Sequence, residues 1–76
     1  MPEYNGHPSW NCWNVSIWLS NDECLYHTMR WYIEKTNRNA SLATKELLRD
    51  LPTRTPDGAV YNRKSVYLAV KSEMEN

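Results

Sequence analysis

The sequence predicts an all-α fold, a small three-helix domain that is preceded by a short aromatic helix or extended segment. Three observations favour this class. Apolar residues recur at helical spacing in three stretches, capping residues precede two of these stretches, and a proline follows the other. The 76 residues are enough for one domain, residues 1–76, with a thin hydrophobic core.

The aromatic segment, residues 10–19, can be read in two ways. Its apolar and β-branched residues alternate with other residues, as they do in a strand. Trp10, Trp13 and Ile17 also share one face of a helix. Because the chain offers no second convincing strand to pair with it, a short helix is favoured. Residues 1–9, with two prolines and a glycine, predict an irregular lead-in.

The first main helix is expected over residues 21–36. Ser20 and Glu23 have the spacing of a capping box, in which the two side chains bond each other's backbone N–H groups. Met29 and Ile33 lie on the apolar stripe of this helix, together with Leu25 and Tyr32.

Two further helices are expected over residues 40–51 and 63–74. Pro52 ends the former, because the residue before a proline avoids helical angles. Asn62 is placed to cap the latter. Between them, the segment Thr55-Pro56-Asp57-Gly58 predicts a tight turn.

The aromatic composition indicates either an aromatic core or a surface for a partner. The chain has four tryptophans, five tyrosines and no phenylalanine. Tryptophan and tyrosine fill cores, but they are also the typical anchors of protein interfaces. Four tryptophans exceed what a thin core can surround, so we expect some to be exposed. The predicted partner-binding residues are Trp18, Tyr26 and Trp31.

Charge is balanced overall but unevenly distributed along the chain. Residues 1–37 carry four acidic and two basic side chains, and residues 38–71 carry three acidic and seven basic ones. This excludes an acidic mimic of DNA and a strongly basic nucleic-acid-binding protein. A modest basic face on the last helix suggests an alternative function, a small helix-turn-helix-like DNA-binding protein. The residues for it are Arg63, Lys64, Tyr67, Leu68 and Lys71.

Metal binding and catalysis are not predicted. His7, Cys12, Cys24 and His27 supply ligand types for zinc, and Cys24 and His27 have the helical spacing to share one ion. The spacing of His7 and Cys12 matches no zinc module, so zinc stays a minor alternative. No motif joins a nucleophile to a base, and a chain of this length leaves little room for a substrate pocket. We therefore expect no metal, no cofactor and no enzymatic activity.

The compartment follows from the apolar pattern. No apolar run approaches the length of a membrane span, and the residues after Met1 do not resemble a signal peptide. We expect no membrane partner, a location in the cytoplasm, and reduced cysteines. Self-association into a homo-oligomer stays open.

Three motifs together resemble a family of small proteins encoded by tailed bacteriophages and prophages. They are W-N-V-x-x-W from Trp13 to Trp18, N-D-E-x-L-Y from Asn21 to Tyr26, and T-P-D-G-x-x-Y from Thr55 to Tyr61. The resemblance covers about residues 10–70. It implies a viral protein in the host cell cytoplasm that binds a host protein, for example to inhibit a defence system such as CRISPR. It implies no catalytic residue.

Overall fold

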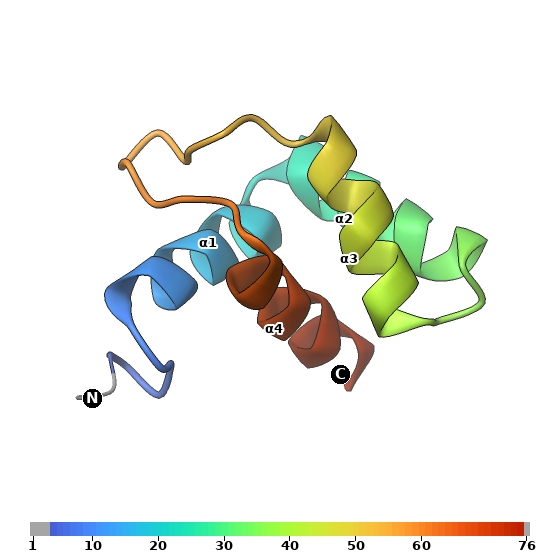
Figure 1. Ribbon diagram of the computed structural model, residues 1–76, viewed down its shortest axis with the longest axis horizontal. Coiled ribbons are helices and arrows are strands. Elements are labelled where there is room, and N and C mark those ends of the chain that lie inside the picture. Colours follow the sequence, from blue (N-terminus) through green and yellow to red (C-terminus); the bar gives the residue numbers. More distant parts are fainter. Residues whose placement is uncertain (1–3, 76) are drawn as a thin grey trace.

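Four helices and one long loop make up the computed structural model, which describes residues 4–75 (Figure 1). The helices are α1 (Trp10–Asn21), α2 (Glu23–Lys35), α3 (Ala40–Asp50) and α4 (Arg63–Met74). The predicted all-α class is confirmed. The aromatic segment is a helix, α1, and not an extended segment.

The last helix holds the arrangement together. α4 packs against both α1 and α3, while α2 contacts the other three helices. Figure 1 shows α4 between α1 and α3, and it shows the loop of residues 51–62 passing from the end of α3 across to α1. The loop therefore brings a segment late in the chain onto the first helix.

The core of the described residues contains aliphatic side chains, Met29 and Tyr61, but no tryptophan. Its completely or almost completely buried members come from all four helices and from the long loop: Val15, Leu19, Met29, Ile33, Ala43, Leu47, Ala59, Val66 and Val70. All four tryptophans lie at the edge of this core or outside it. Of the two interpretations of the aromatic composition, an aromatic core is therefore wrong for tryptophan.

The predicted capping box at Ser20 is wrong. α1 continues through Asn21, and the backbone N–H of Asp22 still bonds the carbonyl of Trp18 at 3.1 Å. The Ser20 hydroxyl donates to the carbonyl of Ser16 at 2.7 Å, so it is not free to cap the next helix. Asp22 is the N-cap instead, and its carboxylate accepts from the N–H of Leu25 at 3.0 Å. The helix expected over 21–36 thus begins two residues later, at Glu23.

A capping box does form at the start of α4. The Asn62 side chain accepts from the N–H of Ser65 at 2.9 Å, and the Ser65 hydroxyl accepts from the N–H of Asn62 at 3.1 Å. Asn39 caps α3 through the N–H of Leu42 at 3.0 Å. These asparagines satisfy backbone donors that a helix start leaves without a partner.

Candidate functional site

Trp18, one of the predicted partner-binding residues, bonds to the long loop. It is half-buried on α1, and its indole N–H donates to Asp57 Oδ2 at 2.9 Å. Among the residues that the structure describes, it is the one tryptophan whose indole N–H bonds another described residue. Trp18 therefore anchors the loop and offers no free polar group to a partner.

Asn14 is the buried centre of this anchor. It is 3% exposed, its amide donates to Asp57 Oδ2 at 3.0 Å, and its carbonyl accepts from the Thr55 hydroxyl at 2.7 Å. One turn earlier, the Asn11 side chain bonds both the N–H and the carbonyl of Val60, at 2.7 and 2.9 Å. Two asparagines of α1 thus hold the loop, Asn11 through the backbone of the loop and Asn14 through two of the loop's side chains.

The anchor also sets the charge of Asp57. Hydrogen bonds from Asn14 and then from Trp18 stabilise its carboxylate and hold the pKa of Asp57 below the ordinary 3.8, although partial desolvation opposes them. Asp57 is the second central residue of the predicted Thr55–Gly58 turn, which the N–H of Gly58 closes onto the carbonyl of Thr55 at 2.9 Å. The turn presents its carboxylate to α1.

Tyr26, the second predicted binding residue, joins α2 to α4. Its hydroxyl donates to Glu73 Oε2 at 3.0 Å, and Arg30 reaches the same oxygen at 3.2 Å. This hydrogen bond to Glu73 raises the pKa of the Tyr26 phenol. The polar end of Tyr26 is thus used inside the molecule.

Trp31, the third predicted binding residue, is the most exposed tryptophan, with 56% of its surface accessible. Its ring meets the edge of Tyr32 at a centroid distance of 4.9 Å, and the ammonium of Lys35 lies 4.8 Å from its centroid. The Tyr32 hydroxyl in turn donates to Asp50. Trp18 lies on α1 and the other two predicted residues on α2, and no recorded contact joins the three into one surface.

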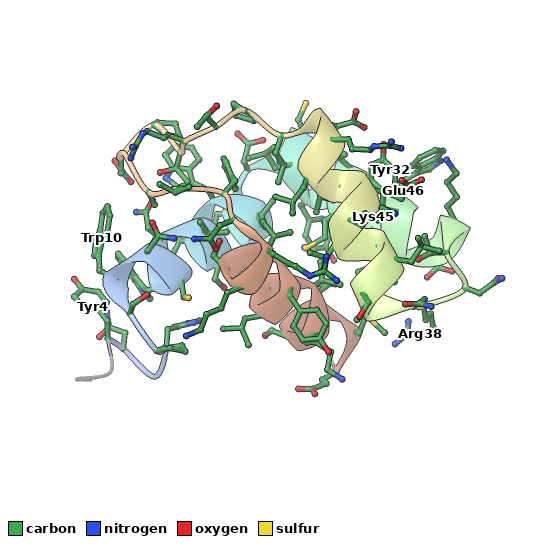
Figure 2. The ribbon with its side chains drawn as sticks, viewed as in Figure 1. Tyr4, Trp10, Tyr32, Arg38, Lys45 and Glu46 are labelled. Atoms are coloured by element: carbon green, nitrogen blue, oxygen red, sulfur yellow. The ribbon has the colours of Figure 1, made fainter. Side chains whose placement is uncertain are left out.

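The outer side of α1 carries a different aromatic group. Trp10, Trp13 and Ile17 follow one another at helical spacing, and Trp10 and Ile17 are 41% and 37% exposed. The Tyr4 ring lies 4.9 Å from that of Trp13, and Figure 2 shows Tyr4 and Trp10 at the same end of the molecule. We call these four residues the α1 outer face. The shared helical face of its three α1 residues is visible in the sequence, but their exposure is not.

A tight turn places Tyr4 on this face. The N–H of Tyr4 bonds the carbonyl of His7 at 2.7 Å and the reverse bond is 2.8 Å, with Asn5 and Gly6 both at positive φ. Such a turn favours asparagine and glycine at those positions. The lead-in expected over residues 1–9 therefore contains an ordered turn, and residues 1–3 lie outside the described part.

Three of the five predicted nucleic-acid-binding residues line one hollow. Arg63, Lys64 and Tyr67 of α4 surround a volume of about 420 Å³ together with Ser41 of α3. Leu68 and Lys71 are half-buried and do not line it. The hollow lies between α3 and α4, the two helices that the sequence suggests as a helix-turn-helix pair. Along the chain, the loop of residues 51–62 joins these two helices.

The described residues show neither a metal centre nor a membrane span. No three of their histidine, cysteine and acidic side chains are grouped as ligands for a metal ion; Cys12 is buried, while Cys24 and His27 are exposed. None of the helices in residues 4–75 has the length and apolar character needed to cross a bilayer.

Comparison with known proteins gives one result. No curated protein and no solved structure matches the chain. One family model matches all of residues 1–76, and its description is "Family of unknown function (DUF7249)". The chain belongs to this family.

Proposed function

We propose that this protein is a non-enzymatic binding protein that captures another protein through the α1 outer face. The observation that supports the proposal is the exposure of Trp10 and Ile17 on one side of α1, where the exposed Tyr4 of the preceding turn packs against Trp13. Monomeric proteins rarely expose contiguous apolar side chains unless the patch binds something. Large aromatic side chains are also the usual energetic anchors of protein interfaces.

The charge pattern of α1 favours the same side. Residues 10–21 contain no charged side chain, and α1 is the one described helix of which this is true. Burying the α1 outer face against a partner would therefore desolvate no charged side chain of α1 itself. Interface cores are depleted of charged residues for that reason. The partner should present an apolar and uncharged patch of its own.

The anchors differ from those expected from the sequence. The polar groups of Trp18 and Tyr26 already donate hydrogen bonds to Asp57 and Glu73, so neither group is free to bond a partner. Trp31 is exposed, but it stands beside Lys35 on another helix. We therefore place the main anchors at Trp10, Trp13 and Ile17, with Trp31 outside the contact.

The resemblance to small bacteriophage proteins suggests the class of partner. In this proposal the partner is a protein of a bacterial host, met in the host cytoplasm, and capture blocks its activity. A component of a defence system such as CRISPR is one such target. A second copy of this chain could cover the same face, and the experiment separates the two.

The test uses the intact protein as bait in a bacterial lysate, followed by titration with the purified partner that it captures. The double variant Trp10→Ser/Ile17→Ser should weaken the partner's Kd by about thirtyfold or more, because two anchors are removed. Trp31→Ser is the matched control, since it removes an equally large exposed side chain from α2, and its Kd should change little. Circular dichroism verifies that both variants fold.

Two results would contradict the proposal. One is a partner that binds the double variant as tightly as the wild type, or that is lost only with Trp31→Ser. The other is a wild-type chain that sediments as a dimer, which the double variant makes monomeric, because a second copy would then cover the face.

A further inference from the structure

The hollow between α3 and α4 is lined by groups that suit an anion. Arg63 and Lys64 supply two positive charges, and Tyr67 and Ser41 each supply a hydroxyl. Arg63, Lys64 and Ser41 are exposed, and Tyr67 is half-buried. Among residues 4–75, no carboxylate lines the hollow. Apolar atoms make up most of the surface of this open hollow, and the cationic and hydroxyl groups of these residues are its polar part.

The cations of the hollow are also free of partners within the described chain. The ion pairs among residues 4–75 use Arg30 and Arg49, and neither Arg63 nor Lys64 approaches a carboxylate within the 4.0 Å of an ion pair. The recorded side-chain hydrogen bonds of other basic residues, such as Arg54 to the Gly58 carbonyl, likewise leave these two out. Binding an anion would thus break none of the ion pairs within residues 4–75.

Tyr67 gives the hollow a flat apolar wall. It follows Arg63 by one helical turn, so its ring and the guanidinium lie on the same side of α4. Proteins that bind single-stranded nucleic acid combine two kinds of contact. Cationic side chains bind the phosphates, and aromatic side chains stack against the bases. Lys71 follows Lys64 by two turns, about 10 Å along the helix, which extends the positive charge beyond the hollow.

We propose that this hollow binds a nucleotide unit, with its phosphate on Arg63 and Lys64 and its base against Tyr67. The Ser41 hydroxyl from α3 completes the set of donors. The unit comes either from a free mononucleotide or from a single strand of nucleic acid that continues toward Lys71. This site is separate from the α1 outer face and does not depend on the proposed protein partner.

A single strand fits the structure better than a DNA duplex read by a helix-turn-helix. In that motif three or four residues join the two helices. Here residues 51–62 separate α3 from α4, and their Asn11, Asn14 and Trp18 contacts hold them on α1. The two helices are therefore not positioned relative to one another by a short turn.

The experiment measures fluorescence anisotropy of a labelled oligothymidine strand, and calorimetric binding of adenosine monophosphate, with the full-length protein. Arg63→Gln and Lys64→Gln should each weaken binding by about tenfold and lower the slope of log Kd against log salt by about one. Tyr67→Ala should weaken binding through lost stacking. Lys35→Gln, which removes the same charge from α2, is the matched control and should change Kd by less than about twofold.

The two probes distinguish the sources of the nucleotide. Binding of adenosine monophosphate with the same dependence on Arg63 and Lys64 indicates a free nucleotide, and binding of the strand alone indicates nucleic acid. The proposal is overturned if neither probe binds at low salt, or if Lys35→Gln is as harmful as Lys64→Gln. It is also overturned if an oligoglutamate peptide binds as tightly as the strand. Retention of nucleotide binding by Trp10→Ser/Ile17→Ser would separate this site from the α1 outer face.

Discussion

The two sides of α1 use the same kind of side chain in opposite ways. On the side that faces the long loop, Trp18 is half-buried and its indole N–H bonds a carboxylate, and Asn14 beside it is hydrogen-bonded through both its amide nitrogen and its amide oxygen. On the outer face, the indole N–H groups of Trp10 and Trp13 bond no atom of residues 4–75, and Trp10 is 41% exposed. A tryptophan whose indole N–H bonds another part of the chain has a structural role. A tryptophan whose indole N–H is free is a candidate for binding a partner.

The contrast also explains two of the motifs that suggested the phage resemblance. Asn14 and Trp18 of the first motif meet Thr55 and Asp57 of the last one across about forty positions of sequence. Their joint occurrence has a structural reason, because each motif supplies the hydrogen-bond partners of the other. These residues hold the loop on α1, whereas the neighbouring Trp13 lies on the outer face.

The largest expected effect on stability is that of Asn14→Ala. The substitution leaves the buried Thr55 hydroxyl without its acceptor and removes a donor from Asp57. Because a buried polar group without its partner is costly, the free energy of unfolding should fall by about 2–3 kcal/mol. Urea denaturation followed by circular dichroism measures the change. A loss as small as that of an exposed substitution would show that the loop is not held through Asn14.

Trp18→Phe should have a smaller effect in the same direction. It keeps an aromatic ring against the loop but removes the N–H that donates to Asp57. The midpoint of thermal unfolding should fall by less than it does for Asn14→Ala, since Asn14 still holds the carboxylate. Near-ultraviolet circular dichroism would report any change in aromatic packing. An unchanged midpoint would mean that water replaces this hydrogen bond at no cost.

Protonation of Asp57 offers a smaller and reversible test of the same anchor. Its pKa is lowered in the folded state, mainly by Asn14 and then by Trp18. Its contribution to stability is therefore complete above the unfolded value and is lost as the pH falls through the folded-state pKa. The stability difference between the wild type and Asp57→Asn should be constant from about pH 7 to about pH 5 and should shrink below about pH 4. A difference that stays constant down to acid unfolding would contradict the assignment.

The smallest effect on stability is expected for Trp10→Ser on the outer side of α1. The side chain is 41% exposed and its indole makes no recorded hydrogen bond within residues 4–75. The free energy of unfolding should fall by less than it does for Asn14→Ala, because much of the Trp10 ring already lies in water and no buried polar group loses its partner. Urea denaturation of Trp10→Ser and Asn14→Ala under the same conditions compares the two losses in the free energy of unfolding directly. A loss of similar size for the two variants would remove the distinction between an anchor for the loop and a face for a partner.

Local signals in the sequence were sufficient for most of the helices. Asn62 caps α4 as predicted, and α3 and α4 lie within one residue of the expected ranges 40–51 and 63–74. The predicted start of α2 is wrong because the sequence around Ser20 fits two structures, the cap of a new helix or the last turn of the previous one. Once residues 10–19 form a helix, its backbone hydrogen bonds run through to Asp22. The capping position then moves to Asp22 itself.

The binding residues were harder to predict than the helices, because exposure depends on contacts between distant segments. The indole N–H of Trp18 is not free for a partner because the loop of residues 51–62 lies on α1 and brings Asp57 to it. The Tyr26 hydroxyl is not free because α4 brings Glu73 to it. Arg63, Lys64 and Tyr67 share one side of a helix in any structure, yet Ser41 joins them only because α3 packs on α4. Helical class follows from short-range spacing and capping, which the sequence contains completely. Which aromatic side chains remain free follows from the long-range packing that buries or bonds the others.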